Sequence, residues 1–255
     1  IKELLEAYMT FGGMPSLTEV DLEIDKALTI LDGIYSSVVI RDILEREKQR
    51  GRRQVTDSSL LRKIIMFLAD NIGNNTSINS ISNILLNEKL IDTKPAVQTV
   101  QSYVSTLLEA YIFYEIKRFD IKGKEYLKTL GKYYIVDIGL RNYLLGFRNR
   151  DIGHSIENIV YFELLRRGYD VAIGKIGENE IDFIATNINT KIYIQVTENM
   201  ASSSIREREI ASFYKIQDNF EKIVITNDES YLGIQDGIKI IRLVDFLLDE
   251  KILKN

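Results

Sequence analysis

Apolar residues recur at helical spacing through the first 110 positions of the chain. In residues 96–110, for example, Val97, Val100 and Val104 fall on one face of a helix, and such a stripe is typical of an amphipathic helix packed on a core. Turn residues such as Gly12-Gly13 separate these segments. The pattern predicts helices over residues 1–10, 20–36, 37–50, 60–71, 78–86 and 96–110.

Serines and a proline mark where several of these helices begin. Ser58 or Ser59 is predicted to cap the helix at 60–71 and Ser77 the helix at 78–86, because a serine hydroxyl accepts a free N–H group of the first turn. Pro95 is predicted to be the first helical residue of the last helix, since proline lacks the N–H that goes unpaired there.

Two runs of β-like sequence, residues 112–121 and 124–136, follow the last helix. The dipeptide Lys122-Gly123 between them predicts a hairpin turn. Three helices followed by a hairpin are the order of elements in a winged helix-turn-helix. We therefore predict that residues 57–148 form such a domain, after a helical segment formed by residues 1–56.

Helices and strands alternate in the last part of the chain, residues 149–255, which predicts an α/β domain. Gly168 is expected to end its first helix, because glycine readily takes the left-handed backbone of a helix C-terminus. A hairpin followed by a strand–helix–strand crossover predicts a mixed sheet. The expected helices are 155–167, 204–217 and 244–251, and the expected strands are 170–175, 180–185, 191–198, 222–226 and 238–243.

The composition removes several kinds of active site. The chain has no cysteine and one histidine, His154, which excludes disulfides, thiolate zinc sites and multi-histidine metal sites. A metal site would need oxygen ligands, which favour Mg²⁺ or Mn²⁺. The lack of cysteine fits a cytoplasmic protein, and no apolar run approaches the roughly 20 residues that cross a bilayer. Because the chain begins with Ile1, we expect a fragment.

Polar residues occupy related positions in three apolar elements of the last part. Glu157 lies in SIENIVYFELLRRG, Asp182 in EIDFIATN, and Gln195 and Thr197 in KIYIQVTE. Alternation is expected to turn Asp182 away from its neighbours and to place Gln195 and Thr197 on one face. The arrangement resembles the core of PD-(D/E)XK nucleases, in which a helix glutamate, a strand aspartate and an E-x-K pair hold a metal that cuts phosphodiesters. Here that pair reads Gln-Val-Thr, so two positions that supply catalytic charge are altered.

Longer runs resemble a specific family of AAA-type ATP-binding proteins of bacteria and archaea, which end in a winged helix and a PD-(D/E)XK-like domain catalogued as domain of unknown function number 4143. The similar runs are GGMPSL, VVIRDILER, YYIVDIGLRNYLLG, ENIVYFELLRRGYDV and EIDFIA. The resemblance covers essentially the whole chain. It implies an α+β multi-domain fold, in which residues 1–56 end an upstream ATPase module and residues 149–255 form an α/β restriction-endonuclease-like domain with a mixed sheet.

The resemblance also assigns roles to residues. Glu157 and Asp182 become the two acids, and Gln195 and Thr197 take the E-x-K positions as candidate catalytic residues. Glu157, Asp182 and Gln195 are the candidate Mg²⁺ ligands, although an amide oxygen binds a cation more weakly than a carboxylate does. Lys175 or Lys191 could supply the missing lysine charge. ATP is expected to bind only through an upstream ATPase domain, because no G-x-x-x-x-G-K-[ST] occurs here.

The predicted winged helix carries candidate contacts to DNA. Its third helix presents short polar and amide side chains that can contact bases or phosphates, and its hairpin has a local excess of basic residues suited to phosphates, although the net charge of the whole chain is −4. A second basic patch lies at Arg46–Arg53. The candidate nucleic-acid-binding residues are Gln98, Gln101, Ser102, Lys117, Arg118, Lys122 and Lys124, with Lys128 and Lys132 beside them on the hairpin.

Three hypotheses for function follow. The first is a nucleic-acid-binding or regulatory portion of an AAA-type ATPase with a degenerate nuclease-like domain. The second is an active Mg²⁺-dependent DNA nuclease that uses Glu157, Asp182 and Gln195. The third is a protein-interaction module of a defence or toxin–antitoxin type system, in which the hairpin is only a solvated surface.

Overall fold

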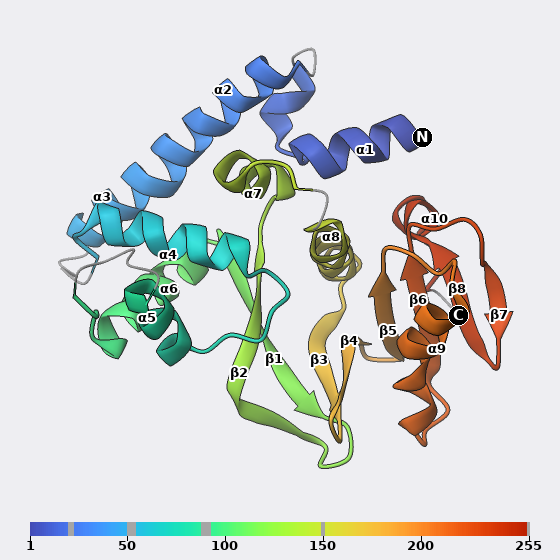
Figure 1. Cartoon of the computed structure of the whole chain (residues 1–255). Helices are drawn as coiled ribbons and strands as arrows, with labels where there is room; N and C mark the ends of the chain where they lie inside the picture. The colour runs from blue at the N-terminus through green and yellow to red at the C-terminus, as the bar shows by residue number, and fades with distance from the viewer. Residues whose placement is uncertain (20–22, 50–54, 88–92, 149–150, 254–255) are drawn as a thin grey trace. The chain divides into compact units, whose positions relative to one another are not determined.

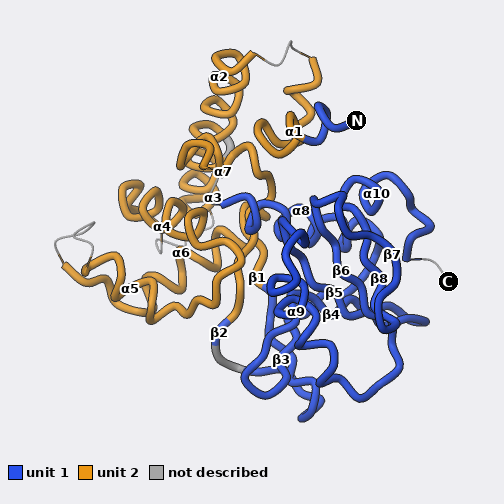
Figure 2. The backbone as a smooth tube through the Cα atoms, turned by 45° about the vertical axis from the view of Figure 1, so that its right-hand side comes forward, with its two compact units in different colours: residues 1–5, 116–130, 149–255 blue, residues 6–115, 131–148 orange. Residues whose placement is uncertain are grey.

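The computed structural model describes residues 1–19, 23–49, 55–87, 93–148 and 151–253 (Figure 1). The chain is an α+β protein with helices and a mixed sheet, as predicted. It divides into two compact units (Figure 2). Unit 1 comprises residues 1–5, 116–130 and 149–255, and unit 2 comprises residues 6–115 and 131–148.

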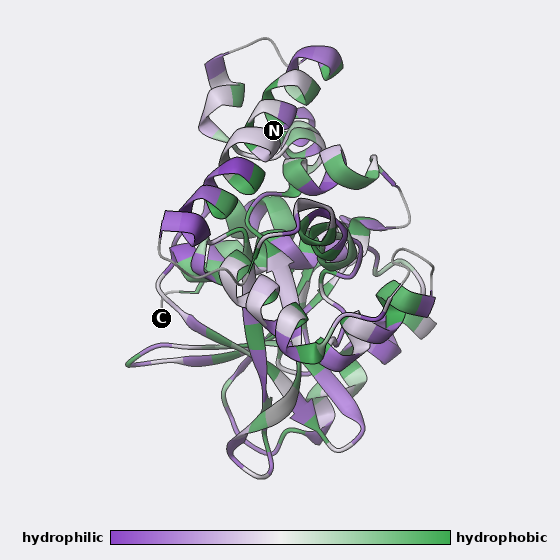
Figure 3. Cartoon of the chain, turned by 90° about the vertical axis from the view of Figure 1, so that its left-hand side faces the viewer, coloured by the Kyte–Doolittle hydropathy of each residue, from purple (hydrophilic) through white to green (hydrophobic). Residues whose placement is uncertain are grey.

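Helices form most of unit 2, and hydrophobic and hydrophilic residues alternate along them (Figure 3). The predicted boundary between residues 36 and 37 is wrong. The backbone stays helical through it, because neither Ser36 nor Ser37 forces the chain out of the helix. The helices are α1 (Lys2–Phe11), α2 (Ile24–Ile34), the π-helix η2 (Tyr35–Asp42), α3 (Ile43–Gln49), α4 (Ser58–Asp70), α5 (Ile78–Asn87), α6 (Val97–Glu109) and α7 (Ile138–Leu145), with a short 3₁₀ turn η1 (Pro15–Glu19).

The helix starts agree only in part with the sequence signals. Ser77 caps α5 as predicted, because its Oγ accepts the N–H of Ser80 at 3.1 Å. Asp57, and not a serine, caps α4. Its carboxylate accepts the N–H groups of Ser59 and Leu60. Pro95 lies before the cap residue Ala96 instead of inside α6, and its carbonyl accepts the hydroxyl of Ser82 at 2.9 Å.

Helix α7, which the periodicity did not predict, begins at the buried residue Asp137. The Asp137 carboxylate accepts the N–H of Leu140 at 3.1 Å and, across 124 positions of sequence, the N–H of Gly13 at 2.7 Å. One side chain therefore caps α7 and anchors the turn after α1. Burial raises the pKa of Asp137 above its ordinary value, although these N–H donors oppose the rise.

Two further side chains of α7 bind the ends of other helices. Asn142 Nδ2 donates to the carbonyls of Met9 and Thr10, both at 2.9 Å, at the end of α1. The fully buried Arg141 donates through Nε to the carbonyl of Ala69 at 2.9 Å, at the end of α4. Because the last carbonyls of a helix lack partners within it, these contacts join α1 and α4 through α7.

The approach of α1 to α7 requires a glycine. A Cβ at Gly139 would lie 1.9 Å from the carbonyl oxygen of Phe11. A side chain at this position would therefore push the two segments apart. The core of unit 2 is built around these helices by Leu31, Val39, Leu61, Ile65, Leu68, Ile81, Val104, Leu107, Phe113 and Leu140, among others.

An eight-stranded sheet follows the order β2-β1-β3-β4-β5-β6-β8-β7. The pairs β1·β3, β5·β6 and β6·β8 are parallel, whereas β3·β4, β4·β5 and β7·β8 are antiparallel. The strand β7 was not predicted. The strands are β1 (Phe113–Asp120), β2 (Glu125–Ile135), β3 (Asp170–Ile176), β4 (Asn179–Thr186), β5 (Lys191–Thr197), β6 (Glu221–Thr226), β7 (Gly233–Gln235) and β8 (Ile238–Arg242).

Helices cover both faces of the sheet in unit 1. Tyr193, Val224 and Ile240 of the strands form one cluster with Ile210 of α9 (Ser203–Ala211) and Phe213 of the 3₁₀ turn η4 (Phe213–Lys215). The predicted helix 204–217 therefore ends earlier than expected, at Ala211. The helices α8 (Ile152–Arg166) and α10 (Leu243–Leu248) pack on the strands and on each other, and cover the opposite face.

Gly168 ends α8 as predicted. Its φ is +80°, a left-handed conformation that glycine adopts without strain. The N–H of Gly168 bonds to the carbonyl of Leu165, and the N–H of Tyr169 bonds to that of Leu164, which is the Schellman pattern. Within the described ranges, no helix is long and apolar enough to cross a membrane.

We expect Asp137→Ala to lower the free energy of unfolding by about 2 kcal/mol, because it removes a helix cap and leaves the Gly13 N–H without its acceptor. Asp57→Ala is the matched control, since Asp57 caps only its own helix and is exposed, and it should cost about 1 kcal/mol. Urea unfolding of both variants measures the difference. Equal losses would contradict the role assigned to Asp137.

The raised pKa of Asp137 predicts a pH dependence. A carboxyl whose pKa is higher in the folded than in the unfolded state contributes stability that is complete below the unfolded value and is lost as the pH rises through the folded value. The stability difference between the protein and Asp137→Asn, which cannot titrate, should therefore be larger at about pH 4 than at about pH 7. Urea unfolding at both pH values measures it, and a difference that grows with pH would contradict the assignment.

Candidate nuclease-like site

The motif residues Asp182 and Gln195 bond to each other's strands. The main-chain pairing of β4 with β5 ends at Phe183↔Ile194. Beyond this pair, side-chain hydrogen bonds connect the two strands. Gln195 Oε1 accepts the N–H of Asp182 at 2.7 Å, and Asp182 Oδ2 accepts the N–H of Val196 at 2.8 Å. The two side chains thus hold the strands together where the regular ladder ends.

An irregularity in β4 explains why this happens at Asp182. The register with β3 runs Ala172↔Ile184 and then Gly174↔Ile181, so that Asp182 and Phe183 together oppose the single residue between those two partners. This is a β-bulge, which disrupts the ladder locally and bends the strand. Simple alternation is therefore wrong here, because Ile181 and Ile184 both belong to the cluster under α9.

Glu157 lies in α8, which packs on the face of the sheet opposite to α9. It is 9% exposed and precedes Tyr161 by one helical turn. The ring of Tyr161 stacks on that of Phe183, with centroids 6.2 Å apart. Glu157 is thus held on the side of the sheet toward which Phe183 points, near the strand that carries Asp182.

Gln195 and Thr197 lie on the face covered by α9. They share the face of Tyr193, as alternation predicts, because the register of β5 with β6 is regular from Ile192 to Thr197. The Thr197 hydroxyl donates to the carbonyl of Asn199 at 3.2 Å. Of the four motif residues, the structure joins Asp182 and Gln195 directly.

Lys191, a candidate source of the missing lysine charge, is engaged at the far end of β5. Its Nζ lies 3.8 Å from Asp218 Oδ2 and over the rings of Tyr193 and Phe220, at 4.7 and 5.2 Å from their centroids. The other candidate, Lys175, pairs with Glu180 in the β3–β4 register.

The donor atoms present are a poor match to a magnesium centre. Mg²⁺ prefers carboxylate and other hard oxygen ligands in near-octahedral geometry. Here Asp182 Oδ2 and Gln195 Oε1 already accept main-chain N–H groups, and Gln195 brings no charge. In the part of the chain that the structure describes, no group of three or more His, Cys, Asp or Glu side chains is arranged to hold a metal ion.

The candidate nucleic-acid contacts of α6 belong to unit 2. Gln98 and Gln101 are exposed, as predicted for an outward face. Ser102 is half-buried, and its hydroxyl donates to the carbonyl of Gln98 at 3.0 Å. Its hydrogen is therefore engaged within the helix, which leaves the two amides as the free polar groups among the three candidates.

The candidate contacts of the hairpin belong to unit 1, except Lys132, which belongs to unit 2. Lys117, Lys122 and Lys124 are exposed, whereas Arg118 is half-buried with its Nε lacking a hydrogen-bond partner. The prediction that Lys132 offers a phosphate contact is wrong, because that residue is 4% exposed. The side chain of Lys128 and the residues Arg50, Arg52 and Arg53 of the second basic patch lie outside the described residues.

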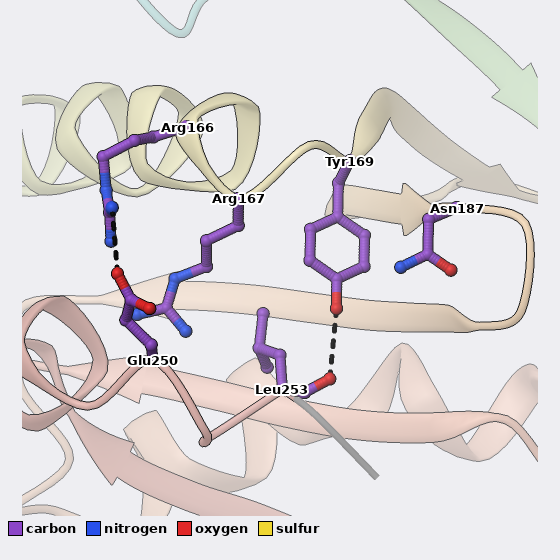
Figure 4. Close-up of a pocket in the computed structure, with 6 residues that line it drawn as sticks. All are labelled: Arg166, Arg167, Tyr169, Asn187, Glu250 and Leu253. Carbon is purple, nitrogen blue, oxygen red and sulfur yellow. Dashed lines mark hydrogen bonds and ion pairs between the residues drawn. The ribbon is translucent and has the colours of Figure 1, made fainter.

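The sequence reasoning missed a second polar site in unit 1. Arg166 and Arg167 line a cavity where α8 ends, together with Tyr169, Asn187 and Glu250 (Figure 4). The only sequence signal is the pair of arginines before Gly168, which is equally typical of cations placed at a helix C-terminus.

Comparison with known proteins places the chain among uncharacterized relatives. Residues 2–151 match a family described as a domain of unknown function, DUF8612. An uncharacterized protein of Haemophilus influenzae is 38% identical over 248 residues, which cover 97% of this chain and 58% of the relative. The uncharacterized protein MJ1544 of Methanocaldococcus jannaschii is 30% identical over 257 residues, covering 95% and 54%. The chain thus spans about half the length of these relatives.

A solved structure, that of protein VC1899 from Vibrio cholerae, aligns with 89% of this chain and 55% of its own, with 11% identity and a TM-score of 0.24. A score this low carries no argument about the fold. The resemblance to family number 4143 stays a prediction, since neither the relatives nor this structure tests it.

We expect Gln195→Ala to lower the free energy of unfolding by about 1–3 kcal/mol, because it leaves the Asp182 N–H unpaired beside a disrupted ladder. Gln195→Glu is the matched control, since it keeps an oxygen at the accepting position. Urea unfolding measures both. A neutral Gln195→Ala would show that the contact with Asp182 does not hold the strands together.

Proposed function

We propose a function for this chain, which belongs to the family of the domain of unknown function DUF8612. We infer that it is a nucleic-acid-binding or regulatory portion of a larger ATP-dependent protein, and that its C-terminal part is a degenerate nuclease-like domain. The observation that carries the proposal is the pair of side-chain bonds between Asp182 and Gln195 and the main chains of the facing strands.

These bonds favour a structural use of the motif over a catalytic one. A nuclease centre needs oxygens free to bind a cation and a positive charge beside the scissile phosphate. In this chain Asp182 Oδ2 and Gln195 Oε1 each accept a main-chain N–H group, and the resemblance puts Thr197 where the lysine would be. The helix–sheet–helix layers of unit 1 support a nuclease-like domain, and the neutral Gln195 and Thr197 at the altered positions argue against cutting.

The order of elements from α4 to β2 supports a winged helix-turn-helix. The residue Thr76, between α4 and α5, forms an antiparallel bridge with Gly131 of β2, and their N–H and carbonyl groups exchange bonds of 2.8 and 3.2 Å. A short strand between the first two helices that pairs with the second strand of the hairpin fits this type of domain. In the proposal α6 is the recognition helix, and the turn at Lys122 is the wing.

The proposal assigns ATP binding to a part of the protein outside this chain. The chain contains no Walker A sequence, and the matched region covers only 58% and 54% of its two curated relatives. We propose that the remaining length of such a protein contains the ATPase domain.

We expect the chain to bind duplex DNA with an affinity that falls steeply as salt increases. The double variant Lys122→Ala/Lys124→Ala removes two exposed wing lysines. It should reduce the magnitude of the negative slope of log K against log salt by about 2, because each phosphate contact releases about one counterion. The matched control is Lys26→Ala/Lys251→Ala, which removes the same charge from exposed positions outside the wing. Fluorescence anisotropy with labelled DNA at several salt concentrations gives the slopes.

The same experiment separates the three hypotheses. Salt-independent or absent binding would contradict the proposal and favour the protein-interaction module. Binding followed by cleavage when Mg²⁺ is added, and lost in Asp182→Asn, would favour the active nuclease. Binding without cleavage is the expected result.

A further inference from the structure

A cavity of about 260 Å³ lies in unit 1 where α8 ends. It is small compared with the pockets of drug-sized ligands, and its walls come from segments far apart in the sequence (Figure 4). Its lining residues are Arg166, Arg167, Tyr169, Asn187, Glu250 and Leu253.

The guanidinium of Arg167 is bound on two sides and lacks an acceptor on the third. The side chain is 7% exposed. Its Nε donates to Glu163 Oε1 at 2.6 Å, and its Nη2 donates to the carbonyls of Phe246 and Asp249. The remaining nitrogen, Nη1, is buried without a hydrogen-bond partner. Because a buried donor left unpaired costs about 1–3 kcal/mol, and more when it is charged, this nitrogen points to a missing acceptor.

A second donor faces the cavity from the loop between β4 and β5. Asn187 Oδ1 accepts the N–H groups of Asn189 and Thr190 and the hydroxyl of Thr190, at 2.8–3.0 Å. These three donors fix the orientation of the amide, so that its Nδ2 is directed toward Tyr169 and the cavity, as Figure 4 shows. The Tyr169 hydroxyl donates to the carbonyl of Leu253 at 3.1 Å and closes one side.

The two arginines at the cavity share one buried carboxylate, Glu163. One of the two guanidinium groups therefore has no buried counter-charge of its own. Arg166 and Arg167 both bind Glu163, which is 9% exposed, at 2.7 and 2.6 Å. Arg166 also reaches Glu250 at 3.3 Å, but the Glu250 side chain is 61% exposed. An exposed ion pair of this kind contributes little, so a ligand can replace Glu250 while that carboxylate turns to solvent.

We propose that this cavity binds a small oxyanion, a phosphate or a carboxylate group, between Arg166, Arg167 and Asn187. The lining contributes N–H donors, two of them on cationic side chains, and hydrogen bonds from cationic donors to an oxyanion are stronger than neutral ones. The volume suits a small molecule and not a polymer. The site is separate from the nuclease-like motif and independent of the proposed function.

Isothermal titration calorimetry of the whole chain with sodium phosphate and, separately, with sodium acetate tests the proposal at constant ionic strength. We expect at least one of the two anions to bind saturably. The anion that binds shows whether the site takes a phosphate or a carboxylate group. Asn187→Asp keeps the oxygen that orders the loop but replaces the amide donor with a negative charge, and should weaken binding at least about tenfold.

Glu250→Gln provides the opposite change. It removes the competing carboxylate and should strengthen binding severalfold. Its matched control is Glu229→Gln, which neutralises another exposed partner of an arginine, 3.4 Å from Arg242 and outside the cavity. The proposal is overturned if neither anion binds saturably to the protein and to Glu250→Gln. It is also overturned if Glu250→Gln and Glu229→Gln change the affinity for the anion by the same factor. This comparison remains valid even if Asn187→Asp disturbs the loop.

Discussion

The buried carboxylate of Asp137 is the contact on which the helical unit depends. It accepts N–H groups from the first turn of α7 and from Gly13, which follows α1. Asn142 and Arg141 on the same short helix bind the carbonyl ends of α1 and α4. Unpaired groups at helix termini must find partners when they are buried, and here one helix of eight residues supplies partners for two others.

Main-chain groups of the strand pair β4–β5 must also find hydrogen-bond partners. The bulge in β4 lies opposite β3, and the regular register of β4 with β5 ends at Phe183↔Ile194, so main-chain donors beyond that pair need other acceptors. Asp182 and Gln195 satisfy them. An acid and an amide at positions that resemble a nuclease motif are therefore explained by local structure, without a cation.

Periodicity predicted most helices and strands of the chain, because burial of one face leaves a regular trace in the sequence. It missed α7, whose Arg141 and Asn142 are buried polar residues that interrupt any apolar stripe. Simple alternation also fails along β4, where the bulge brings Ile181 and Ile184 into one cluster. Both failures have one cause: contacts between distant segments, such as Gly13 with Asp137, leave no local pattern.

Within the candidate sites the sequence identified residues but not their partners. The structure brings Asp182 and Gln195 together, yet nothing in EIDFIATN or KIYIQVTE indicates that their oxygens bind main-chain N–H groups. Lys132 was grouped with the exposed lysines of the hairpin, although it is buried. Exposure and hydrogen bonding are properties of the folded chain, and they decide whether a polar residue is available to a ligand.

That distinction separates the two polar sites of unit 1. At the nuclease-like motif Asp182 Oδ2 and Gln195 Oε1 each accept a main-chain N–H group, so these oxygens already have a structural use. At the end of α8 a buried donor of Arg167 is unpaired, and the competing carboxylate of Glu250 is exposed. An oxyanion at the end of α8 would supply the acceptor that the buried Arg167 donor lacks. Such an unpaired donor is a property of the folded chain, and no sequence motif marks it.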